Sequence, residues 1–243
     1  MKYFLKLSYN GTAYHGWQKQ ENANSVQETL DNAMSVLIGA PIETVGCGRT
    51  DTGVHAMCYF AHFETLSHIP DEFIYQLNSI LPHDIAIEDF KPIEAENHAR
   101  FSALSREYRY FIHSRKDPFL RERSYFLHKK LDIELMNVAC KVLREYNDFE
   151  SFCKKGADNK TTLCEIYEAD WITLNHQIIF KIRADRFLRN MVRTIVGTML
   201  DVGLHKISMD EFRQIIEAKD RQFSGSSVPA CGLYLWDVKY PGI

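Results

Sequence analysis

The residues whose types and spacing best suit catalysis lie in one short segment, residues 46–56, which is rich in glycine and threonine. Arg49 and Asp51 place opposite charges two residues apart there, and Gly46, Gly48 and Gly53 allow backbone conformations closed to other residues. A loop of this kind lets a ligand approach closely, so it is a candidate catalytic loop built around the Asp51 carboxylate. The plain alternative is a tight turn closed by an Asp–Thr hydrogen bond.

This segment fits none of the common enzyme motifs. Its glycine spacing matches neither a dinucleotide fingerprint nor a Walker loop, and no Lys follows in the place that a Walker loop requires. No Ser or Cys stands with a His in a hydrolase motif, and a glycosidase would need a second positioned carboxylate near Asp51, where the sequence offers none. We interpret His15, His55 and His62 as structural. The candidate chemistry therefore rests on a single carboxylate.

A second group of charges lies at residues 186–193. Helical spacing would place Arg186, Arg189 and Arg193 close to one face of a helix and apolar side chains on another. A surface helix with its charges in solvent is the plain alternative. Because the planar fork of Arg suits carboxylates and phosphates, we favour an anion-binding role for this helix.

The elements that must position these groups read as a mixture of strands and helices. Stretches that alternate or are rich in β-branched and aromatic residues predict strands, and apolar stripes after capping residues predict helices. The expected strands are residues 2–9, 57–63, 85–90, 107–113, 164–174, 178–184 and 233–240, and the expected helices are residues 26–38, 70–80, 132–146, 187–202 and a last one opened by the pair Ser208 and Glu211.

This pattern predicts an α+β protein of two similar mixed halves, with antiparallel sheets and helices packed on them, flanking a central positively charged active-site cleft. The halves are expected at residues 1–103, which carry the Asp51 loop, and at residues 104–243, which carry the Tyr and Arg motifs. The sequence has no repeat at a fixed period, so their similarity is a structural expectation only.

The bulk composition is that of an ordinary globular protein, with 45% hydrophobic and 25% charged residues in 243. Its six cysteines show no C-x-x-C spacing, which argues against a metal site and favours free thiols. The first 17 residues contain only a short apolar stretch, interrupted by Lys6 and Ser8, which suits neither a signal peptide nor a membrane span. We therefore expect a cytoplasmic protein with no membrane partner.

The net charge of −3 hides an uneven distribution. Residues 98–130 carry a local charge of +6 and residues 181–193 one of +4, so the remainder carries −13. Aromatic side chains such as Tyr108, Phe111 and Phe119 lie among the first group of charges. A solvated charged face is one explanation, but basic side chains interleaved with aromatic ones are typical of a nucleic-acid site.

Several stretches of the chain together resemble one known family. Residues 48–56, Gly-Arg-Thr-Asp-Thr-Gly-Val-His-Ala, closely resemble the catalytic segment of the tRNA pseudouridine synthase A family. Other stretches that resemble the family follow in the same order, at residues 9–12, 16–18, 78–85, 98–103, 108–110, 187–197 and 229–235. The resemblance thus covers essentially the whole chain.

The resemblance implies an isomerase that converts uridine to pseudouridine in the anticodon stem-loop of tRNA, at positions 38, 39 and 40. It also implies a homodimer that holds tRNA across both subunits, and no metal or organic cofactor. By matching residues, Asp51 is the essential aspartate and nucleophile, Arg49 a neighbouring positive charge, Tyr108 the aromatic residue that meets the target base, and Arg193 the partner of Asp51.

Two positions depart from the family pattern, since Asn10 stands where Asp is usual and Thr52 where Ala is usual. Both changes are small and would affect positioning rather than the reaction. A target within a stem must be flipped out of the base stack, and phosphate contacts would offset that cost. We expect these contacts from Arg100, Arg106, Arg109 and Arg189.

Two alternatives remain open at the level of sequence. The first is a pseudouridine synthase that acts on another RNA or on other tRNA positions, because the residues around Asp51 would look the same. The second is a non-catalytic RNA-binding protein in which Asp51 is only a turn residue.

Overall fold

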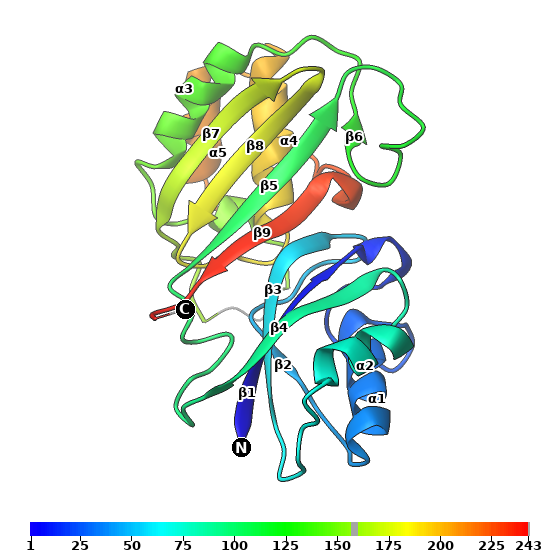
Figure 1. Cartoon of the computed structure of the whole chain (residues 1–243). Coiled ribbons are helices and arrows are strands. Elements are labelled where there is room, and N and C mark those ends of the chain that lie inside the picture. The colour runs from blue at the N-terminus through cyan, green and yellow to red at the C-terminus, as the bar shows by residue number, and fades with distance from the viewer. Residues whose placement is uncertain (157–159, 243) are drawn as a thin grey trace. The chain divides into compact units, whose positions relative to one another are not determined.

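The computed structural model describes residues 1–156 and 160–242 of the chain. It divides into two compact units (Figure 1). Unit 1 comprises Met1–Leu104 together with Tyr234–Ile243, and unit 2 comprises Ser105–Leu233. Each unit combines strands with helices, so the predicted α+β class is confirmed.

The sheet of unit 1 has the strand order β4-β1-β3-β9, with the short β2 also paired to β3. Neighbouring strands are antiparallel except for β3 and β9, which run parallel. The side chains of Leu5 and Leu7 on β1, which lies between β4 and β3, are fully buried. This burial explains why most residues of β1 are apolar. The strands are β1 (Lys2–Tyr9), β2 (Val45–Gly46), β3 (His55–Glu64), β4 (Ile85–Ile93) and β9 (Leu233–Lys239).

Two helices complete unit 1, and both follow from local sequence signals. Helix α1 (Val26–Ile38) begins where the Ser25 side chain accepts the Glu28 N–H, and it ends at Gly39, whose φ of 74° is left-handed. Helix α2 (Phe73–Ile80) packs against β4 and begins three residues later than expected, because residues after Pro70 first form a turn. A 3-10 turn, η1 (Gly11–Ala13), follows β1.

The sheet of unit 2 has the order β5-β8-β7, with β6 running parallel to β5 at its edge. Three helices lie against it (Figure 1), and α3 contacts both β7 and α4. The elements are β5 (Ser105–His113), β6 (Tyr125–Phe126), α3 (Ile133–Leu143), η2 (Glu150–Phe152), β7 (Ile166–Leu174), β8 (Gln177–Ala184), α4 (Met191–Gly203), α5 (Met209–Glu217) and η3 (Ala230–Gly232).

Two expectations about these elements were wrong. The sheets are mixed rather than antiparallel, because β9 and β6 each add a parallel neighbour. Helix α4 begins at Met191 rather than at residue 187, because Asn190 has a left-handed φ of 65° that breaks the helical backbone before it. Arg186 and Arg189 therefore precede the helix and do not share a helical face with Arg193.

Within residues 1–156 and 160–242, no helix is long and apolar enough to cross a membrane. The same residues contain no group of three or more His, Cys, Asp or Glu side chains placed to hold a metal ion. All six cysteines are free thiols, and four of them are buried. The cysteines thus behave as small core side chains.

Candidate active site

The Asp51 loop, residues 46–54 from the end of β2 to the residue before β3, is supported by residues 9–17 of the same unit, here called the support segment. Tyr9 and Thr50 share a hydrogen bond of 2.8 Å between their hydroxyl groups. The Trp17 N–H donates to the Thr50 carbonyl at 3.3 Å. The side-chain hydroxyl and the backbone carbonyl of Thr50, the residue directly before Asp51, are therefore both fixed.

The end of the loop is held by the same segment. The Gly53 N–H donates to the Tyr14 carbonyl at 3.2 Å, and the Gly11 N–H donates to Nδ1 of His55 at 3.1 Å. Within the loop, the Val54 N–H donates to the Asp51 carbonyl at 3.1 Å. His55, interpreted from sequence as structural, is buried and stacks on Tyr234. Backbone hydrogen bonds on either side of Asp51 thus define its position.

Asp51 itself is half-buried, whereas Arg49 is exposed. The floor beneath the loop is aromatic, since Trp17 and Tyr59 stack with ring centroids 4.1 Å apart, and the Tyr59 hydroxyl donates to the Gly48 carbonyl. An apolar floor and backbone partners hold the loop while its carboxylate stays within reach of a ligand. This is the arrangement that a preorganised nucleophile requires.

Two glycines in the support segment allow it to approach the loop closely. A Cβ at Gly11 would lie 2.0 Å from the Val54 carbonyl oxygen, and a Cβ at Gly16 would lie 2.3 Å from the Thr50 carbonyl oxygen. Gly16 also has a φ of 93°, which other residues rarely adopt. The support segment can therefore contact the Asp51 loop only with glycine at these positions.

Substituting Gly16→Ala is expected to destabilise the protein by at least about 3 kcal/mol, because backbone strain adds to a clash with the loop. For a chain of this size that loss lowers Tm by roughly 6 °C or more. Gly39→Ala is the matched control, since Gly39 has a φ of 74° and no atom lies within 4 Å of its added Cβ. Equal shifts in Tm for the two variants, measured by thermal unfolding, would show that the contact with the loop contributes nothing.

A second structured segment of unit 1 carries Arg100. The buried His62 accepts the Ala99 N–H at its Nδ1, at 3.1 Å, and the Tyr240 hydroxyl donates to the Ala99 carbonyl. Arg100 lies over the ring of the exposed Phe101, 5.5 Å from its centroid. Residues 98–101 therefore present an arginine and an aromatic ring on a fixed backbone.

This segment predicts a pH dependence of stability. Burial, together with smaller effects of the charges of Lys2 and His98, lowers the pKa of His62 to about 4. Because the folded pKa lies below the ordinary value of 6.5, the contribution of neutral His62 is complete above pH 6.5 and is lost as the pH falls towards 4. The loss by pH 4.5 is about 2 to 3 kcal/mol.

The variant His62→Gln keeps a hydrogen-bond acceptor but does not titrate, so it should lack this loss. The measurement is the free energy of unfolding in urea at pH 7.5 and pH 4.5 for both proteins. Parallel pH dependences in the two proteins would mean that His62 is not the group responsible.

Three predicted residues of unit 2, Arg106, Tyr108 and Arg109, lie on strand β5. Arg106 donates through Nη1 to the Asp185 carbonyl at 2.8 Å, and the ring of Tyr108 meets Phe187 edge-on with centroids 5.1 Å apart. Phe187 belongs to the segment that leads into α4. Tyr108 is thus fixed beside the segment that carries the other predicted arginines.

Sequence reasoning missed Glu107, which is only 2% exposed. Its carboxylate pairs with Arg183 and accepts the Arg109 Nε–H at 2.9 Å, while Lys181 lies 4.0 Å away. These cations offset the cost of burying the charge. The signal was present in the sequence, since Glu107 is the one acid in the basic stretch around Arg106 and Arg109. Arg109 is consequently oriented by Glu107 before any ligand binds.

Arg193 lies in the first turn of α4, and its Nε donates to the Val228 carbonyl at 2.9 Å. Next to it, Asn190 donates to the hydroxyls of Thr194 and Ser227. Arg189, by contrast, is exposed. The side chain of Arg193 is therefore oriented by the segment before η3, which the sequence did not indicate.

The predicted site residues fall into two sets. Arg49, Asp51 and Arg100 belong to unit 1, where the first two share the Asp51 loop and Arg100 lies on a separate segment. The remaining ones belong to unit 2, and they are Arg106, Tyr108, Arg109, Arg189 and Arg193. The structure thus defines two local arrangements, a held carboxylate and a held set of aromatic and cationic groups.

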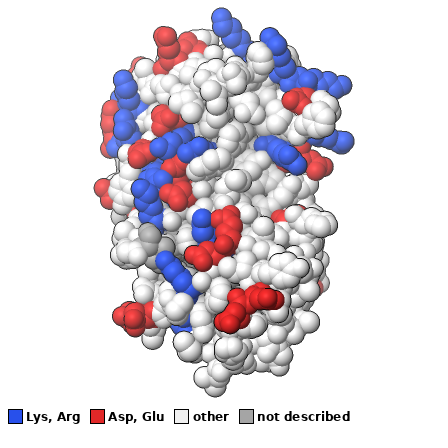
Figure 2. Space-filling model, in the orientation of Figure 1, with Lys and Arg blue, Asp and Glu red and all other residues white. Residues whose placement is uncertain are grey.

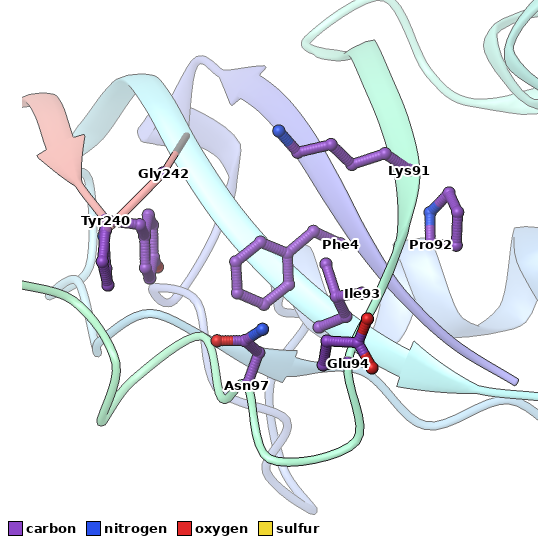
Figure 3. Close-up of a pocket in the computed structure, with 9 residues that line it drawn as sticks. Phe4, Lys91, Pro92, Ile93, Glu94, Asn97, Tyr240 and Gly242 are labelled. Atoms are coloured by element: carbon purple, nitrogen blue, oxygen red, sulfur yellow. The ribbon is translucent and has the colours of Figure 1, made fainter.

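Two pockets, one in each unit, are lined by residues other than the predicted site residues. In unit 1 a pocket of about 380 Å³ opens between Phe4 and Tyr240, with Lys91, Glu94 and Asn97 at its edge (Figure 3). In unit 2 a pocket of about 290 Å³ borders Val228, the backbone partner of Arg193. No residue of the Asp51 loop lines either of these two pockets.

The sequence profile of a family described as tRNA pseudouridine synthase matches residues 7–102 and 139–241. The matched segments contain Asp51 and Arg193, whereas Tyr108 falls between them.

The chain is also similar over its full length to proteins named tRNA pseudouridine synthase A. It is 49% identical to that of Parabacteroides distasonis over 242 residues, which covers 99% of this chain and 96% of the relative. The identity is 48% with that of Porphyromonas gingivalis, covering 99% and 97%, and 41% with that of Bacillus subtilis, covering 99% of each. With its carboxylate loop and its α4 arginine inside the matched segments, the chain belongs to the tRNA pseudouridine synthase family, which is a family of isomerases.

Proposed function

We propose that this protein isomerises uridine to pseudouridine in the anticodon stem-loop of tRNA, at positions 38, 39 and 40, with Asp51 as the nucleophile. The observation that carries the proposal is the Asp51 loop, in which hydrogen bonds to Thr50 and Gly53 hold the backbone on either side of the half-buried Asp51. Family membership and the names of the full-length relatives support tRNA as the substrate.

The reaction is an isomerisation in which atoms and electrons balance within one nucleotide. The bond between uracil N1 and sugar C1′ breaks, the uracil turns while it stays bound, and C5 bonds to C1′. The proton lost from C5 is offset by one gained at N1. An ionised Asp51 can serve by attacking either sugar C1′ or ring C6, so one carboxylate is enough.

The residues of unit 2 supply the other functions in this proposal. Tyr108, held against Phe187, stacks on the detached uracil. Arg193, whose Nε donates to the Val228 carbonyl, serves as the positively charged partner of Asp51 in this proposal. Under this proposal both units act on the same uridine, in the positively charged cleft predicted from the sequence.

Binding of the tRNA itself rests on cationic side chains. Lys and Arg side chains occupy several areas of the face in Figure 2. Phosphate contacts by Arg100, Arg106, Arg109 and Arg189 would offset the few kcal/mol needed to flip a stem nucleotide out. We include a homodimer that shares the tRNA, in the cytoplasm and without a metal or organic cofactor, as part of the proposal.

The test is release of tritium from a tRNA transcript labelled at uracil C5, followed by mapping of the modified positions. Release with pseudouridine at positions 38, 39 or 40 is the expected result. Pseudouridine found only outside the anticodon arm would replace our substrate with another. Binding without any tritium release would favour the RNA-binding alternative, and a monomeric mass in light scattering would remove the dimer from the proposal.

A further inference from the structure

A surface loop of unit 2 combines free cations with an exposed aromatic ring. The basic loop, residues 114–124 between β5 and β6, contains Phe119, whose side chain is 83% exposed. This loop lies between the two segments that the family profile matches. The profile itself therefore assigns no role to this loop.

The backbone of the basic loop is well defined. The Phe119 N–H donates to Oδ1 of Asp117 at 2.8 Å, and the N–H groups of Arg123 and Ser124 donate to the Leu120 carbonyl at 3.0 and 3.1 Å. At its base, β6 pairs with the end of β5. Phe119 is thus presented to solvent on a fixed turn. Because the backbone of this turn is already ordered, little conformational entropy is lost when a ligand binds to the ring.

The charges around the ring are mostly positive. The loop carries four basic residues against Asp117 and Glu122. Among the described residues, Arg115, Lys116 and Arg121 are exposed and form no ion pair. The upper right of the face in Figure 2 shows several Lys and Arg side chains with a few acidic ones among them. The loop therefore offers donors to a polyanion on both sides of an aromatic ring.

We infer that the basic loop binds an unpaired nucleotide of the RNA substrate, with Phe119 stacking on the base and Arg115, Lys116 and Arg121 contacting the flanking phosphates. Every base presents a face on which an aromatic ring can stack, but only an unpaired base can be reached by a side chain from outside the helix. A paired stem would contact only the basic side chains of the loop and not the ring of Phe119. The loop thus recognises the single-stranded part of the anticodon arm, which adds a second contact region to the active site.

This inference rests on the proposed function, because it takes tRNA to be the bound RNA. The experiment uses the full chain and measures its affinity for two RNAs at fixed salt, an anticodon-arm hairpin and a blunt duplex of the same stem. Phe119→Ala is expected to weaken binding of the hairpin by roughly 5- to 100-fold and to leave binding of the duplex unchanged. Phe119→Tyr should restore it.

Tyr75→Ala is the matched control. Tyr75 is 73% exposed on α2, but it follows the acids Asp71 and Glu72, so its ring should contribute nothing to RNA affinity. For the cations, Arg121→Gln is expected to weaken binding of both RNAs and to reduce the slope of log affinity against log salt by about 1.

Two results would overturn the inference. Unchanged affinity of Phe119→Ala for the hairpin would show that no base stacks on the ring. A change from dimer to monomer in light scattering of Phe119→Ala would instead assign Phe119 to contact with a second copy of the chain.

Failure of the inference can be told apart from failure of the proposed function. Tritium release by the wild type, with hairpin binding unaffected in Phe119→Ala, would remove only the loop contact. Loss of hairpin binding in Phe119→Ala, with no tritium release by the wild type, would keep the loop as an RNA-binding surface and remove the isomerase.

Discussion

Asp51→Asn is expected to lower turnover on tRNA by about 10⁴-fold or more while tRNA affinity stays within about twofold of the wild type. The asparagine side chain has the same shape, so the hydrogen bonds that hold Thr50 and Gly53 should persist. It lacks the negative charge and nucleophilic oxygen that the reaction requires. The effect should therefore appear in kcat rather than in binding.

The measurement is tritium release under single-turnover conditions, with affinity determined separately by filter binding. Thr52→Ala is the matched control, because Thr52 is exposed in the same loop and alanine is the residue that the family resemblance favours there. It should retain near wild-type turnover. If Asp51→Asn also retained turnover, Asp51 would be only a turn residue and the proposed mechanism would be wrong.

Arg193→Lys is expected to reduce kcat by roughly 10²- to 10³-fold with little change in tRNA affinity. The Nε of Arg193 is used to bind the Val228 carbonyl at 2.9 Å, which leaves the end of the guanidinium to face another group. Lysine has a single side-chain nitrogen, so it cannot bind the Val228 carbonyl and also present a charge to that other group. The loss should follow from misplacement of the positive charge rather than from its removal.

Arg189→Gln separates this positioning role from phosphate binding. Arg189 is exposed and lies just before α4, so its loss should weaken tRNA affinity and reduce the salt dependence of binding by a slope of about 1, with kcat nearly unchanged. Measuring kcat, affinity and salt slope for both variants tests the division of roles. Equal losses of affinity with no difference in kcat would contradict it.

The secondary structure was largely accessible from local sequence, because its signals act over a few residues. Strand β1 has the bounds that alternation predicted, and α1 begins at Ser25 and ends at Gly39 as its caps required. The pair Ser208 and Glu211 forms the expected reciprocal capping box at α5. Asp51 was also prominent in the sequence, since a charged residue between glycines has few structural uses.

Other features depend on contacts between distant segments. The sequence placed Arg186 and Arg189 on a helix, but the left-handed Asn190 delays α4 until Met191. Donation from Asn190 to Ser227, 37 residues away, helps to stabilise that backbone, and no local pattern encodes it. The parallel pairing of β9 with β3 joins residues about 180 positions apart for the same reason.

The sequence by itself determined the family and the α+β class and predicted the carboxylate, because these depend on residue types and on short spacings. Only the tertiary structure decided how the carboxylate is held. Gly11 and Gly16 look like ordinary turn glycines in the sequence, yet they let residues 9–17 contact the Asp51 loop at distances that no Cβ would allow. Likewise, the burial of Glu107 among cations arises from pairing between β5 and β8, and that pairing orients Arg109. Hydrogen bonds and steric contacts of this kind join segments that are far apart in the chain, so they appear only once the chain has folded.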